Sequence, residues 1–256
     1  MRIIGCQYSI TWESPEANFE SVNQLLEGSE FETESLIILP EMFATGFSMN
    51  VDRIADDPLI KPFLGALALK YRSWIIAGYV TRSPDGRGSN QALIYSPEGT
   101  QMGSYDKIHP FSFGGEDKVY APGETVHVFE VGDFRICPFV CYDLRFPEIF
   151  RTATRMGANT FVVIANWPSP RTAHWTALLR ARAIENQAFV VGVNRTGKDP
   201  KLSYSGQSIV FNPLGEIISE QDESTSTLDA TLEMVELEEW RKKFPALQDI
   251  HQSFTP

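Results

Sequence analysis

Apolar stretches alternate with polar turns along the whole chain, and they follow two different spacings. Residues 36–39 form an all-apolar run, which is typical of a strand covered on both faces. Ser14 and Pro15 suit the N-cap and first position of a helix, and an apolar stripe at helical spacing follows them. A second helix is expected to begin at Asp57 and Pro58, where apolar side chains recur at every fourth position: Leu59, Phe63, Leu67 and Tyr71.

The expected elements fall in a similar order in the two halves of the chain. Further strands are predicted at residues 3–9, 74–80, 90–95, 101–105, 126–130, 134–138, 160–165, 189–193, 206–211, 216–219 and 225–231. Further helices are predicted at residues 147–156, 172–186 and 232–244. This order predicts an α/β fold in which two sheets with helices outside pack as one sandwich, in a single domain over residues 1–256.

The composition narrows the class of partner. Hydrophobic residues make up 43% and charged residues 21% of the chain, which are ordinary globular values. There are 33 acidic and 22 basic residues, giving a net charge of −11. This balance argues against nucleic acid or an anionic membrane surface as a partner, because both need clustered Lys and Arg. The sequence shows neither a signal peptide nor an apolar run long enough to span a membrane.

The chain has three cysteines, Cys6, Cys137 and Cys141. An odd number in a chain with a full core is not a disulfide framework, so the cytoplasm is the simplest compartment. Cys137 and Cys141 have no second cysteine pair or nearby His to complete a zinc site, and no metal is expected.

Cys141 stands where an apolar strand gives way to a helix that Pro147 can open. Such a sharp turn exposes a nucleophile and directs backbone N–H groups at an oxyanion. The alternative is a buried structural cysteine, since free Cys is among the most buried residue types.

Glu41 and Lys107 also follow predicted strands. A carboxylate at a strand end can reach into a cleft as a general base, and a Lys near a thiol can stabilise an oxyanion. Taken singly, each is better explained as an exposed surface residue. His109 is a less favoured partner of the thiol, because no Asn or Asp that would orient it can be identified.

A fourth segment begins just after the strand predicted to end at residue 165. Trp167 is a candidate pocket wall, and Arg171 can bind a substrate carboxylate with two hydrogen bonds. Core packing for Trp167 and a surface ion pair for Arg171 are the alternatives. Arg180, Arg182 and Glu185 fit structural ion pairs along the following helix.

Together these segments resemble the nitrilase-like carbon–nitrogen hydrolase superfamily. Glu41 in LPEMFATGF, Lys107 in YDKIHPF and Cys141 in CYDLRFPE are similar to its Glu–Lys–Cys triad. The CYD, RFPE and NWP details are most similar to the ω-amidase branch, which acts on 2-oxo dicarboxylic acid monoamides. The resemblance implies a four-layer α–β–β–α sandwich, a homodimer or larger homo-oligomer, and a second glutamate, for which Glu116 is the best match and Asp117 its neighbour.

The expected function is therefore hydrolysis of a small amide, such as 2-oxoglutaramate, to a carboxylate and ammonia through a Cys141 thioester. Glu41 is expected to act as the base, while Lys107 and the backbone N–H of Tyr142 bind the oxyanion. No cofactor is expected. The alternatives are nitrile or N-carbamoyl hydrolysis on the same triad, a catalytically silent binding protein, and a redox sensor using Cys137 and Cys141.

Overall fold

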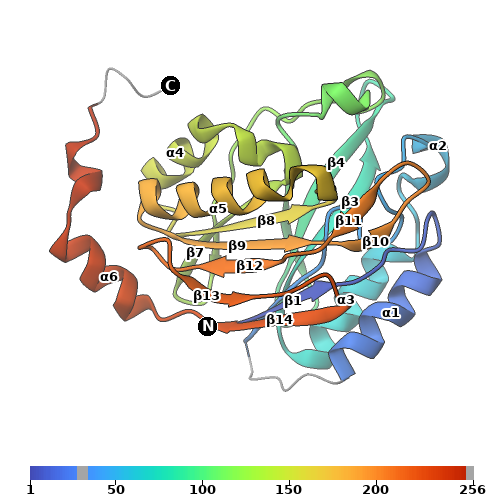
Figure 1. Cartoon of the computed structure of the whole chain (residues 1–256). Helices are drawn as coiled ribbons and strands as arrows, with labels where there is room; N and C mark the ends of the chain where they lie inside the picture. Colours follow the sequence, from blue (N-terminus) through green and yellow to red (C-terminus); the bar gives the residue numbers. More distant parts are fainter. Residues whose placement is uncertain (28–33, 252–256) are drawn as a thin grey trace.

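The protein folds as two six-stranded sheets packed face to face between layers of helices (Figure 1). The structure is a computed structural model that describes residues 1–27 and 34–251. The first sheet has the order β14-β1-β2-β3-β4-β5, and the second has the order β13-β12-β9-β8-β7-β6. The expected four-layer α–β–β–α sandwich is confirmed.

Each sheet is built around parallel strands. In the first sheet the strands are β1 (Arg2–Gln7), β2 (Leu36–Ile38), β3 (Trp74–Arg82), β4 (Gly88–Tyr95), β5 (Gln101–Asp106) and β14 (Ser226–Thr231). In the second they are β6 (Phe129–Val131), β7 (Phe134–Val140), β8 (Thr160–Ala165), β9 (Phe189–Asn194), β12 (Ile209–Phe211) and β13 (Ile217–Glu220). Strands β1, β2 and β3 are parallel to one another. The same is true of β7, β8 and β9 in the second sheet. The carboxyl ends of each set of three therefore lie together at one edge of their sheet.

Helices cover the outer faces of both sheets (Figure 1). The helices are α1 (Pro15–Glu27), α2 (Val51–Ile54), α3 (Ile60–Tyr71), α4 (Pro147–Arg155), α5 (Thr172–Asn186) and α6 (Met234–Lys243). Helices α1 and α3 pack on the first sheet, and α4 and α5 pack on the second. Arg241 of α6 donates a hydrogen bond to the carbonyl oxygen of Gln187, which caps the end of α5.

Alternation of side chains along the strands fills both faces of the first sheet. In β2, Leu36 and Ile38 belong to the core between the sheets, while Ile37 belongs to the core under α1 and α3. This is the period of two that a strand imposes, and here both faces are buried. The all-apolar run at 36–39 is therefore explained by its central place in the sheet.

The strongest sequence patterns predicted their elements well. The strand at residues 160–165 and the helix at residues 172–186 have the observed bounds. The helix expected from Asp57 was placed too early: α3 begins at Ile60, and Leu59 is 46% exposed. The observed buried face consists of Ile60, Leu64, Leu67 and Ala68. A strict spacing of four drifts about 40° per step around a helix, so it cannot follow one face.

Two small elements were not predicted. Helix α2 is short, and the hairpin of β10 (Thr196–Lys198) and β11 (Ser203–Ser205) forms a separate two-stranded sheet. Both are too short to show a periodic pattern. Across residues 1–27 and 34–251, no helix has the length and apolar character needed to cross a membrane.

Candidate active site

Glu41 reaches the centre of the molecule from the carboxyl end of β2. Its side chain is fully buried. The neighbouring strand β3 allows this because it carries Gly78, whose N–H donates to the Pro40 carbonyl oxygen at 3.2 Å. A Cβ atom on Gly78 would lie 2.6 Å from the Glu41 Cα and 2.2 Å from the Met42 nitrogen. The backbones of the two segments approach so closely that only glycine fits.

Lys107 follows β5 directly, and its backbone is held on both sides. Its N–H donates to the Asn90 carbonyl oxygen, and its carbonyl oxygen accepts from Gly123, each at 2.8 Å. The side chain is buried, and Nζ donates to Glu41 Oε1 at 2.9 Å. The structure therefore brings Glu41 and Lys107, two residues of the expected triad, into contact.

Glu116 is the second carboxylate beside Lys107. It is fully buried, and Lys107 Nζ donates to its two oxygens at 3.1 and 2.8 Å. The Phe111 N–H donates to Glu116 Oε2 at 2.5 Å. Asp117 is exposed, so the structure places Glu116 rather than its neighbour at the site.

Cys141 occupies a strained turn between β7 and the 3-10 helix η3 (Cys141–Arg145). Its φ angle is +48°, in the left-handed region that non-glycine residues rarely adopt. The expected sharp turn at the end of the strand is present, although it enters a 3-10 helix before α4 begins at Pro147. Such strain concentrates at functional positions because the surrounding structure must hold it.

The buried charges act on one another. Burial and the neighbouring Glu41 carboxylate raise the pKa of the Cys141 thiol well above its usual value, against the opposing effect of Lys107. The thiol is therefore protonated at neutral pH. Burial alone would raise the pKa of the Glu41 carboxyl, but Lys107, Asn90 and Asn166 together hold it below its usual value. Glu41 is thus an ionised acceptor beside a neutral thiol.

Lys107 stays protonated because it lies between two carboxylates. Burial lowers its pKa, but Glu116 and Glu41 outweigh that effect and raise the pKa well above the usual value. Burial and the Glu41 charge raise the pKa of Glu116 in spite of the Lys107 charge. The contacts to the Glu116 oxygens come from donors, which favours the ionised form at neutral pH.

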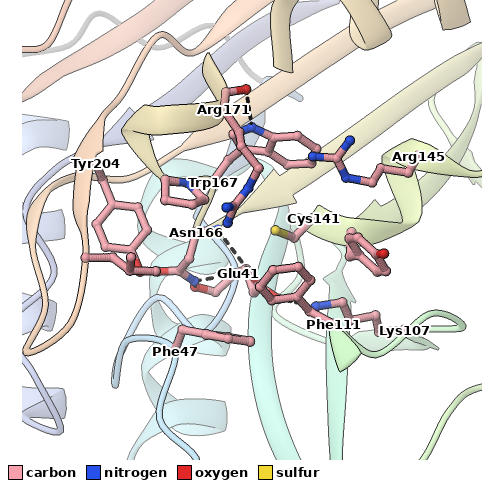
Figure 2. A pocket seen from close by; sticks show the side chains of 13 residues that line it. Glu41, Phe47, Lys107, Phe111, Cys141, Arg145, Asn166, Trp167, Arg171 and Tyr204 are labelled. Atoms are coloured by element: carbon pink, nitrogen blue, oxygen red, sulfur yellow. Dashed lines mark hydrogen bonds and ion pairs between the residues drawn. The ribbon is translucent and has the colours of Figure 1, made fainter. Parts of the chain in front are cut away.

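A cleft opens onto these groups, with about 400 Å³ of empty space when the open solvent at its mouth is included (Figure 2). Its lining includes Glu41, Lys107 and Cys141, together with an aromatic wall and two arginines: Phe47, Phe111, Tyr142, Trp167, Tyr204, Arg145 and Arg171. The structure thus places Trp167 at the pocket wall, where its Nε1 donates to the Arg171 carbonyl oxygen at 2.8 Å.

The two arginine side chains face the cleft without an acidic partner among the residues that the structure describes. Arg171 lies over the Phe111 ring at 5.3 Å, and Arg145 lies over the Trp167 indole at 4.8 Å (Figure 2). Arg171 was predicted as a carboxylate-binding residue, and the alternative surface ion pair is not observed within the described chain. Arg145 was missed, although it stands only four residues after the nucleophile.

Two asparagines were also missed. Asn90 Nδ2 donates to Glu41 Oε1 at 2.7 Å and to Glu116 Oε1 at 2.9 Å. The Asn166 N–H donates to Glu41 Oε2 at 2.9 Å. Each holds the Glu41 carboxylate in one orientation. The available signal for Asn90 was a polar residue at the start of a predicted strand whose later residues, 92–95, are mainly apolar.

The remaining candidates do not line the cleft. His109 contacts Asp143 through Nδ1 at 2.9 Å, so this ring nitrogen is engaged away from the Cys141 thiol. Arg182 pairs with Glu185 at 2.9 Å as expected. Arg180 instead lies over the Phe211 ring at 5.2 Å. Within the described ranges, no group of His, Cys, Asp and Glu side chains has an arrangement that could hold a metal ion.

A neutral thiol, an ionised carboxylate and a buried ammonium around a small cleft define a cysteine-dependent hydrolase site. The sequence comparisons agree with this class: the carbon–nitrogen hydrolase family matches residues 3–242. The chain belongs to the carbon–nitrogen hydrolase family, which confirms the resemblance found in the sequence motifs.

Relatives of known name extend over nearly the whole chain. An ω-amidase, YafV of Escherichia coli, is 40% identical over 253 residues, which cover 97% of this chain and 96% of that protein. A 2-oxoglutaramate amidase of Bacillus subtilis is 32% identical over 253 residues, which cover 97% of each chain. The crystal structure of a carbon–nitrogen hydrolase superfamily protein from Xanthomonas campestris, with an arsenic adduct in its active site, has a TM-score of 0.92 and 35% identity. It covers 98% of this chain and 97% of its own.

Proposed function

We propose that this carbon–nitrogen hydrolase is an ω-amidase, which hydrolyses the terminal amide of a short dicarboxylic acid such as 2-oxoglutaramate. The observation that carries the proposal is the cleft itself, in which Cys141, Glu41 and Lys107 lie opposite two arginines that have no acidic partner among the described residues. The names of the relatives, ω-amidase and 2-oxoglutaramate amidase, support the same substrate class.

The reaction begins with the protonated thiol. Because the pKa of Cys141 is raised, Glu41 takes the thiol proton as the sulfur attacks the amide carbon. A C–S bond forms, and the carbonyl oxygen becomes an oxyanion. Lys107 Nζ and the backbone N–H of Tyr142, in the first turn of η3, bind this oxyanion. Glu41 then returns its proton to the amide nitrogen, and the C–N bond breaks to release ammonia.

The second half of the reaction resolves the thioester. Glu41 accepts a proton from a water molecule, and the resulting hydroxide attacks the thioester carbon. The C–S bond breaks, the sulfur leaves as a thiolate that regains the proton from Glu41, and the carboxylic acid product departs. Glu116 keeps the Lys107 ammonium in place throughout by two charge-assisted hydrogen bonds. No cofactor enters this scheme.

The arginines favour a substrate that carries its own carboxylate. A guanidinium and a carboxylate can form two parallel hydrogen bonds, each stronger than a neutral one. Aromatic rings hold both guanidinium groups from one side. Arg145 Nη2 also contacts His174 Nδ1 at 3.3 Å, and the other guanidinium N–H groups can bind a ligand. The amide would then extend from the arginines toward Cys141.

The proposal is tested by ammonia release from 2-oxoglutaramate, 2-oxosuccinamate, succinamate, glutamine and a simple nitrile. The 2-oxo amides are expected to be the best substrates. Cys141→Ala should abolish turnover while leaving the thermal midpoint nearly unchanged, because it removes one atom from a residue that is itself only partly buried. Ammonia release that persists in Cys141→Ala would contradict the thioester mechanism.

Three wider properties belong to the same proposal. The chain is a single catalytic domain over residues 1–256, it acts on a small-molecule amide in the cytoplasm, and it assembles as a homodimer or larger homo-oligomer. The net charge of −11 supports the exclusion of nucleic acid and of anionic membranes as partners. Size-exclusion chromatography with light scattering tests the oligomeric state.

A further inference from the structure

One buried carboxylate next to the nucleophile takes no part in the mechanism proposed above. Asp143 stands two residues after Cys141, and its side chain has no exposed surface. It does not line the cleft, so it cannot touch the substrate. A buried carboxylate is costly unless hydrogen bonds compensate it, so its partners indicate what it does.

Both oxygens of Asp143 are fully engaged. Oδ2 accepts a hydrogen bond from Tyr105 Oη at 2.8 Å and from the Val140 N–H at 3.1 Å. Oδ1 accepts from the His109 N–H at 3.0 Å and contacts His109 Nδ1 at 2.9 Å. Because an ionised carboxylate only accepts, His109 Nδ1 must carry a proton in this contact.

These partners come from the two segments that carry the reacting groups. Val140 directly precedes Cys141, whose φ angle of +48° must be held by its surroundings. On the other side, His109 lies two residues after Lys107, and Tyr105 Oη accepts a hydrogen bond from the Ile108 N–H at 3.4 Å. One carboxylate therefore connects the turn of the nucleophile to the loop that follows Lys107.

The His109 ring is itself held in place. It stacks on Phe146 with ring centroids 3.7 Å apart and an interplanar angle of 9°. Phe146 directly precedes α4, so the ring is fixed between the carboxylate and the start of that helix. The stacking orients the ring so that Nδ1 faces Asp143.

We propose that Asp143 and His109 are positioning residues that keep the Lys107 ammonium in register with the Cys141 thiol. The inference rests on the proposed roles of Cys141 and Lys107. Neither positioning residue exchanges a proton with the substrate. Their effect is geometric, and a displacement of about 1 Å can cost about 10²-fold in rate.

Matched substitutions of His109 separate geometry from proton transfer. In His109→Asn, the side-chain Nδ2 lies about where Nδ1 lies, so the hydrogen bond to Asp143 is kept. In His109→Gln, the donor lies too far along the side chain. We expect His109→Asn to retain most of its kcat, and His109→Gln and Asp143→Asn to lose about 10²-fold in kcat with KM little changed.

Alkylation of Cys141 by iodoacetamide gives a second measurement that needs no substrate. Its rate should fall in His109→Gln and Asp143→Asn but not in His109→Asn, even if 2-oxoglutaramate is not the substrate. The substrate proposal and the positioning proposal can thus fail separately.

Two results would overturn the positioning role. If His109→Gln and Asp143→Asn lower only the thermal midpoint, with kcat and alkylation rate per folded molecule unchanged, the contacts are merely structural. If His109→Asn loses as much activity as His109→Gln, and a limb of the pH–rate profile shifts or disappears in both variants, His109 transfers protons.

Discussion

Lys107 Nζ lies 2.9 Å from Glu41 Oε1 and 2.8 Å from Glu116 Oε2, with all three side chains at most 1% exposed. One ammonium thus holds two buried carboxylates that would otherwise repel each other. The arrangement keeps Glu41 ionised as a base while Lys107 remains a cation for the oxyanion. The two glutamates are therefore expected to respond differently to substitution.

Glu41→Gln removes the proposed base and keeps the shape of the side chain. Lys107 remains paired with Glu116, so the fold should survive. General base catalysis contributes about 10²–10⁴-fold, and kcat should fall within that range. Steady-state kinetics and the thermal midpoint check this result. Near-normal kcat in Glu41→Gln would remove Glu41 from the mechanism.

Glu116→Gln should weaken the hold on Lys107 without removing the base. A drop of about 10–10²-fold in kcat is expected, since one charge-assisted hydrogen bond contributes about 1.5–3 kcal/mol. Asp117→Asn is the matched control, because Asp117 is exposed. Equal losses in the two variants would show that the effect is one of local charge.

The Glu116 carboxylate should also set the acid limb of the pH–rate profile. Burial and Glu41 raise the pKa of Glu116 above 4.5, whereas the pKa of Glu41 is lowered below 4.5. As pH falls, Glu116 therefore gains its proton first and releases Lys107. Glu116→Gln resembles the protonated form at every pH, so its acid limb should move to lower pH. If the acid limb lies at the same pH in Glu116→Gln, a group other than Glu116 sets it.

Gly78→Ala tests the close approach of β3 to Glu41. The new Cβ would meet backbone atoms of Met42, Glu41 and Pro40. Displacing that backbone should cost about 3 kcal/mol of stability and lower kcat by moving the base. Gly86→Ala is the control, since its Cβ would meet nothing within 4 Å and only its φ of +85° is strained. Loss of kcat in the control alone would contradict the prediction.

Much of this site was predictable because its main residues follow strands. Glu41, Lys107 and Cys141 each come directly or shortly after a predicted strand, and strand ends gather at one edge of a sheet. The strand at residues 160–165 was predicted with its observed bounds because it is a continuous apolar run.

The residues that were missed depend on neighbours far away in the sequence. Asn90 lies in β4, and it reaches Glu41 only because β4 lies between β3 and β5. Periodicity along one strand does not contain this lateral order. Asn166 belongs to the NWP motif, but its bond to Glu41 joins residues 125 positions apart and links the two sheets.

Stability at alkaline pH should depend on Cys6. Burial raises the pKa of this thiol from 9.0 to about 12. A raised folded pKa gives stability that is full below pH 9 and is lost as pH rises toward 12. Between pH 8 and pH 11 the native state should lose about 3 kcal/mol through this group. Urea unfolding should show a shallower pH dependence in Cys6→Ala, and equal slopes would contradict the assignment.

Substrate selection should depend on the two guanidinium groups. Arg171→Met and Arg145→Met keep long apolar side chains against Phe111 and Trp167 but remove the positive charge. A hydrogen bond to a charged group contributes about 1.5–3 kcal/mol, so kcat/KM for 2-oxoglutaramate should fall by about 10–10²-fold. A neutral amide of similar size forms no ion pair with either arginine, and its kcat/KM should change little. The ratio of the two kcat/KM values is therefore the measurement. If both substrates lose activity equally, the arginines act on the shape of the cleft. If Arg145→Met alone changes the ratio, Arg145 rather than Arg171 binds the substrate carboxylate.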